Sequence, residues 1–152
     1  MPPIVTPGAS AGVAAIYQFA APTAYVSLGT TATTISTAQV PAISLGVCDV
    51  YVRWGTLSLN NTATSAVSVT ISSQVGGTQT ANVNGLTPNA YLGAASGSNA
   101  VVTTYIETDG YNVPTNSPFT VTLAGLGSAA GVNAYLRING TITVFALFGG
   151  AI

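Results

Sequence analysis

Charge is almost absent from this sequence. None of its 152 residues is a lysine or a histidine, and only five carry a formal charge, whereas roughly a quarter of an ordinary soluble domain is charged. The five are Asp49, Arg53, Glu107, Asp109 and Arg137. Two arginines cannot neutralise a run of phosphates, which excludes nucleic-acid binding through a basic surface and also a polybasic membrane patch.

The same shortage removes most catalytic chemistry. A serine nucleophile is normally activated by a neighbouring base, and the sequence offers neither His nor Lys for that role. Glu107 and Asp109 share a strand parity, so they are candidates for a carboxylate pair or, with backbone carbonyls, a calcium site. Asp109-Gly110 is, however, typical of a hairpin turn. We therefore expect no catalytic residue, no cofactor, no metal and no enzyme activity.

A single cysteine, Cys48, rules out an intrachain disulfide and a metal site built on a cysteine cluster. Its place beside the start of an apolar strand predicts a buried small hydrophobe rather than a reactive thiol. Long apolar runs are missing as well, so no transmembrane helix or membrane insertion is expected. The N-terminus has no charged n-region and is interrupted by Pro2, Pro3 and Pro7, unlike a secretory leader.

What the sequence does contain is alternation. From Ala134 to Phe148, apolar residues fall on one parity and Arg, Asn and Thr on the other, which is the pattern of a β-strand with one face in a core. A near copy, VYVRWGTLSL, spans Val50 to Leu59, and the two segments hold both arginines. We predict that they are two central strands of one β-sandwich. In the upstream copy the apolar parity changes at Gly55, which predicts a β-bulge or sharp bend.

Six further segments predict short strands. They are residues 24–28, 31–37, 66–75, 78–83, 100–108 and 118–123. Gly76-Gly77 is expected to form a hairpin turn, and Asp109-Gly110 is expected to end the strand at residues 100–108. About eight strands without a convincing helix predict an all-β fold: an antiparallel β-sandwich of jelly-roll or Greek-key type. Residues 1–24 are rich in Pro, Ala and Gly and predict an extended N-terminal arm, with the sandwich domain over residues 25–152.

An uncharged surface gives little electrostatic protection against association, so we expect an assembly protein. The candidate interface residues come from the arm, the two arginines and the apolar tail. They are Ile4, Val5, Ile16, Tyr17, Phe19, Arg53, Arg137, Phe145, Phe148 and Ile152. Each arginine either faces solvent or pairs with Asp49, Glu107 or Asp109, within the chain or across an interface.

Two stretches carry a family resemblance. The two Arg-Gly-Thr strands with the Asn60-Asn61 turn, and the closing RINGTITV at residues 137–144, resemble small β-sandwich virion proteins such as head decoration (cement) and minor capsid proteins of tailed bacteriophages. The resemblance implies a non-enzymatic structural protein, often a trimer, that uses an N-terminal arm to clasp sister subunits or the major capsid protein. It also implies a virion location after assembly in the host cytoplasm.

Two other functions fit the same residues. A β-rich filament, pilus or surface-layer subunit at the extracellular cell surface would use residues 1–24 as a strand donated to the next subunit. A carbohydrate-binding module would stack sugars on Trp54 and on the tyrosines at 51, 105, 111 and 135. The competing interpretation of these aromatics is that Trp54 is core and the tyrosines pack on strand faces, and it is favoured.

Overall fold

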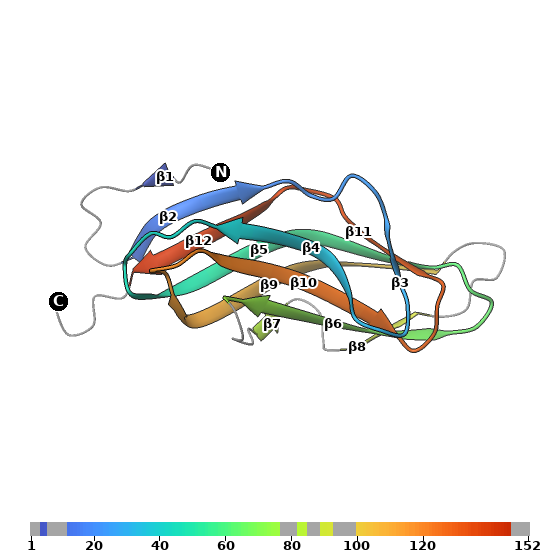
Figure 1. Ribbon diagram of the computed structural model, residues 1–152. Coiled ribbons are helices and arrows are strands. Elements are labelled where there is room, and N and C mark those ends of the chain that lie inside the picture. The colour runs from blue at the N-terminus through green and yellow to red at the C-terminus, as the bar shows by residue number, and fades with distance from the viewer. Residues whose placement is uncertain (1–3, 6–11, 77–81, 85–88, 93–99, 147–152) are drawn as a thin grey trace.

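The computed structural model describes residues 4–5, 12–76, 82–84, 89–92 and 100–146, and in these ranges the chain is all β. Two antiparallel sheets pack face to face as a β-sandwich (Figure 1). The larger sheet contains β1 (Ile4–Val5), β2 (Gly12–Phe19), β3 (Val26–Leu28), β5 (Val47–Asn61), β7 (Asn82–Asn84), β9 (Ala100–Pro114), β11 (Val132–Leu136) and β12 (Gly140–Ala146). The smaller sheet has the order β4 (Thr33–Val40), β10 (Phe119–Gly127), β6 (Val67–Val75) and β8 (Asn89–Leu92). The predicted fold class is confirmed; its finer topology, jelly roll or Greek key, stays a prediction.

Strand β5 organises the larger sheet. Along one edge it pairs with β9 from Val47 to Asn61. Along the other edge its first half pairs with β12 and its second half with β11. The two sequence copies are therefore antiparallel neighbours: Arg53 lies opposite Thr141, and the Arg137 amide donates to the Thr56 carbonyl at 3.1 Å.

The parity change at Gly55 is a β-bulge, as predicted. Gly55 has φ +93°, which favours glycine, and the register with β9 shifts between Arg53 and Gly55. The predicted C-terminal strand, in contrast, is not continuous. It is interrupted at residues 137–139. Ile138 falls on the same parity as the core residues Leu136 and Ile142, but it lies against Gly55 and exposes 43% of its surface. The extra residue in the second copy is accommodated in this break.

One hydrophobic core lies between the sheets and draws side chains from both. Its largest fully buried members are Trp54, Tyr17, Leu28, Leu57, Leu59, Ile106, Leu123, Leu136 and Ile142. Trp54 donates its indole N–H to Thr108 Oγ1 at 2.8 Å, and the Phe19 ring meets the indole edge-on at a centroid distance of 5.3 Å. A buried indole with a satisfied N–H confirms that Trp54 is a core residue.

Three local predictions are corrected by the strand pairing. Asp109-Gly110 is no turn, because β9 continues through it to Pro114; Gly110 instead faces the core, where a Cβ would meet Val75. The described part of the expected second hairpin strand, β7, pairs with β9 of the larger sheet and not with β6. The segment 12–19 of the expected arm is β2, paired with β12 inside the sandwich.

Candidate interaction surfaces

The charged residues gather on one side of the molecule. In β5, Val50, Val52 and Trp54 face the core, so Asp49, Tyr51 and Arg53 face outward. Glu107 and Asp109 of β9 lie directly opposite Arg53 and Tyr51 in the register, on the same outer face. Four of the five charged residues thus share the outer face of the larger sheet.

Arg137 belongs to the same side. It is exposed, and its Nε donates to Ser58 Oγ at 3.0 Å. Ser58 belongs to β5 beyond the bulge and also exchanges a hydrogen bond with Thr103 Oγ1 of β9 at 3.1 Å. Both arginines are therefore exposed side chains of one sheet, and Arg53 has Glu107 as its cross-strand neighbour.

Tyr51 is the most perturbed group on this face. Burial raises its pKa above the usual value of about 10, and its hydrogen bonds to Glu107 and Tyr105 raise the pKa further. The phenol is thus held neutral as a donor to a carboxylate. On strand β9, Tyr105 and Tyr111 expose 40% and 50% of their surface. Further along the sheet, Tyr25 exposes 63% beside Tyr135. Because Trp54 is fully buried, a sugar-binding role would depend on these tyrosines alone.

The outer face of the smaller sheet has a different composition. Among its described residues it presents hydroxyls, amides and the apolar side chains of Ala124 and Leu126, and no charge. Those with at least partial exposure are Thr34, Thr37, Gln39, Ser68, Thr70, Ser72, Gln74, Thr120, Thr122, Ala124 and Leu126. Threonine suits a strand surface because its branched side chain packs well on the pleat, and its hydroxyl keeps the face polar without charge.

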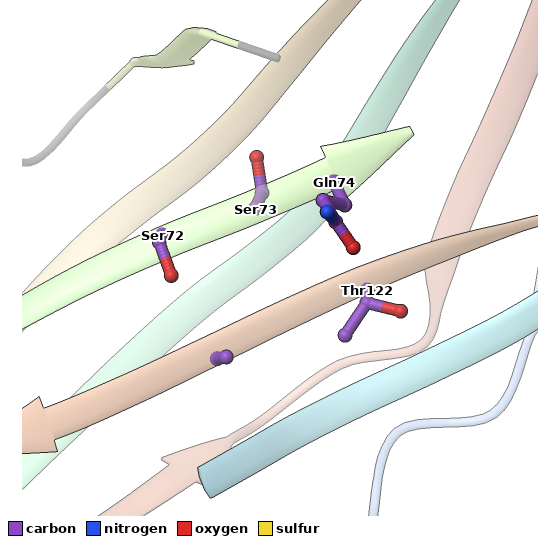
Figure 2. A pocket seen from close by; sticks show the side chains of 5 residues that line it. Ser72, Ser73, Gln74 and Thr122 are labelled. Atoms are coloured by element: carbon purple, nitrogen blue, oxygen red, sulfur yellow. The ribbon is translucent and has the colours of Figure 1, made fainter. Parts of the chain in front are cut away.

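A shallow, open depression of about 250 Å³ lies on this face between β6 and β10. Ser72, Gln74 and Thr122 point to one side of the strands and Ser73 to the other, towards the core (Figure 2). The lining can exchange neutral hydrogen bonds, but it holds no acid, base or metal ligand. In the described ranges no three His, Cys, Asp or Glu side chains come together as a potential metal site.

The predicted interface residues fall into three groups. Tyr17 and Phe19 are buried in the chain's own core, so their placement in an interface is wrong; their alternation with Ala15 marks the core face of β2. Ile16 and Phe145 are half-buried, and the backbone of Ile4 and Val5 pairs with Ile16 and Ala15. Arg53 and Arg137 are exposed; Phe148 and Ile152 lie outside the described residues.

Sequence reasoning missed the uncharged face of the smaller sheet as a surface of interest. The signal was present in residues 66–75, where Ser68, Thr70 and Ser72 fall on the parity opposite Val67, Val69 and Ile71. Cys48 is buried, as predicted for a small hydrophobe, with its thiol 4.0 Å from Thr115 Oγ1. The described residues contain no helix that could span a membrane.

No protein-family model matches this chain, and no curated protein matches it in sequence. The solved structures that are similar to it include two chains of one virus. A chain of infectious bursal disease virus, Gx strain, has a TM-score of 0.44 and 16% identity over 99% of this chain and 37% of that chain. A chain of the Gt strain has a TM-score of 0.34 and 13% identity over 95% of this chain and 46% of that chain. This chain spans less than half of either, and TM-scores below 0.5 support no conclusion about its function.

Proposed function

We propose that this chain is a non-enzymatic structural subunit of a virus particle, of the decoration (cement) or minor capsid kind. It would stabilise the shell through contacts with sister subunits or the major capsid protein, with a trimer as the expected oligomer. The observation that carries the proposal is the segregation of charge: four charged side chains lie on the outer face of the larger sheet, and none of the described side chains on the outer face of the smaller sheet is charged.

A face without charge is poorly protected against association. On a free monomer it would be a liability, whereas in a repeating shell it is covered by neighbours. Flat Ser and Thr surfaces can pack closely against another protein because they carry short side chains that lose little conformational entropy on burial. The absence of His and Lys from the whole sequence supports the non-enzymatic part of the proposal.

The experiment takes a lysate of cells that express the gene and separates particles from free protein on a density gradient. Mass spectrometry then quantifies this chain in each fraction. Chymotrypsin is the suitable protease, because two arginines and no lysine leave few tryptic sites. Co-sedimentation with a shell protein at a fixed stoichiometry supports the proposal. Recovery only in the particle-free fractions contradicts it.

A filament subunit is the second candidate, and one observation favours it. In the described part of the chain, strand β1 pairs with β2 alone, so the same strand could instead extend the sheet of a neighbouring copy. Deleting residues 1–11 leaves the core residues Tyr17 and Phe19 in place. Open-ended polymers, visible by electron microscopy and unable to form after this deletion, would favour the filament over the particle subunit.

A further inference from the structure

The strands that end the two sheets differ greatly in length. Two of them are described together with the residues on either side: β3, with three residues, and β4, with eight. Short edge strands are one of the ways in which β-proteins avoid edge-to-edge association. Strand β4 is not short, and it ends the smaller sheet beside β10.

Other protective devices are also scarce on β4. Thr33–Val40 contains no charged residue and no proline. The strand has one bulge, where its register with β10 shifts between Leu123 and Ala124. This bulge lies in the N-terminal half and leaves Ser36–Val40 in unbroken register with Leu123–Phe119. Five consecutive residues therefore present a regular backbone edge that a second strand can pair with.

We propose that this edge is an interface between copies of the chain, in which β4 pairs antiparallel with β4 of a second copy. Two identical strands that pair in this way are related by a two-fold axis, so the contact closes on itself and joins two four-stranded sheets into one of eight. This pairing rests on the proposed function, because it would be one of the contacts that form the assembly.

The side chains fit such a pairing. Thr37 and Gln39 are exposed on the outer face, whereas Ser36 and Val40 face the core. A register centred on Ala38 keeps these faces aligned and places Thr37 opposite Gln39 of the second copy. A hydroxyl and an amide can exchange a hydrogen bond there, and no register brings like charges together, because β4 has none.

Sedimentation of the intact chain with two lysines on this edge tests the pairing. In the variant Thr37→Lys/Gln39→Lys each new ammonium would face one from the second copy across the interface. The matched control is Gln18→Lys/Ser27→Lys, with the same added charge on exposed positions of β2 and β3 in the larger sheet. We expect the wild-type chain and the control to form a hexamer, in which the β4 contact joins two of the expected trimers, and the edge variant to have half that mass.

Hydrogen exchange on the wild-type chain gives a readout that needs no variant. Amides in Ser36–Val40 that face away from β10 should be protected at high protein concentration and should exchange at least tenfold faster after dilution into the dissociated form. Unchanged mass in the edge variant, or exchange in this segment that is independent of dilution, would overturn the pairing. A lone trimer would overturn it as well and leave the proposed function standing, whereas a monomer at all concentrations would contradict both.

Discussion

At the scale of single residues, close packing around glycine is the most sensitive feature of the fold. Gly140 faces the core, and the ring of Phe19 occupies the space that a Cβ would need. That ring in turn meets Trp54 edge-on. Gly140→Ala must displace an aromatic ring that is already packed, so we expect a loss of about 1–3 kcal/mol of unfolding free energy. Urea unfolding followed by Trp54 fluorescence measures it.

The matched control for this substitution is Gly29→Ala. A Cβ at Gly29 would meet no heavy atom within 4 Å, and the residue has no positive φ. Its unfolding midpoint should stay close to that of the unmodified chain. Equal midpoints for the two variants would show that Phe19 does not pack on Gly140 as described.

A substitution at Tyr17, in contrast, should stabilise the fold. Its ring is fully buried, and its hydroxyl has no hydrogen-bond partner among the described residues. An unpaired buried hydroxyl is costly, so Tyr17→Phe should raise the unfolding free energy by about 1 kcal/mol. Tyr25→Phe, at a side chain with 63% exposure, is the control and should change little. A Tyr17→Phe variant less stable than the unmodified chain would mean that the hydroxyl does have a partner.

The raised pKa values of two tyrosines indicate how the stability of the fold should change with pH. Burial raises the pKa of Tyr17, and burial together with Glu107 and Tyr105 raises that of Tyr51. Above about pH 10 the unfolded chain loses these protons while the folded chain keeps them. Stability should therefore be fully present below pH 10 and fall as the pH rises beyond it. Thermal melts from pH 8 to 11 measure this, and a double Tyr→Phe variant at both positions should show a flatter decline. A decline of equal slope in that variant would contradict the assignment.

At the scale of elements, the junction of β5 with β11 and β12 depends on Gly55. Its φ of +93° strains any other residue, and a Cβ there would meet Ile138. We expect Gly55→Ala to cost about 2–4 kcal/mol, part from the backbone and part from the contact. Ile138→Ala removes only the cost that comes from the contact, because the backbone strain at residue 55 remains. In a double-mutant cycle the cost of Gly55→Ala should therefore be about 1–2 kcal/mol smaller in that background. Strict additivity would contradict the contact.

Most strands could be predicted from the sequence because period-2 alternation is a local signal. The predicted segment 66–75 agrees with Val67–Val75 to one residue, and the predicted Val50 to Leu59 lies within Val47–Asn61. Strand pairing is non-local and leaves no such signal in the sequence. Asp109-Gly110 matches a turn dipeptide, yet it lies within β9, which pairs with β5 on both sides of it. In Gly12–Phe19 small Ala and Gly residues masked the alternation, so a core strand was predicted to be an arm, and with it Tyr17 and Phe19 to be interface residues.

At the scale of the whole molecule, the sequence predicted a shortage of charge, and only the strand register places that charge. Arg53 is far from Glu107 and Asp109 in the chain, and they lie close together on one face because β9 runs antiparallel to β5. The consequence is a sandwich with one charged and one uncharged outer face. An interface made by the uncharged face, or by the edge of β4, has no charges for salt to screen.

The measurement that tests the central claim most directly is the native mass of the full-length chain by sedimentation equilibrium, at about 0.05 and 1 M salt. A subunit built for assembly should form a discrete oligomer at both salt concentrations, with little change in its dissociation constant. A monomer at every concentration would contradict the claim, and an oligomer that dissociates as salt rises would place the contact on the charged face instead.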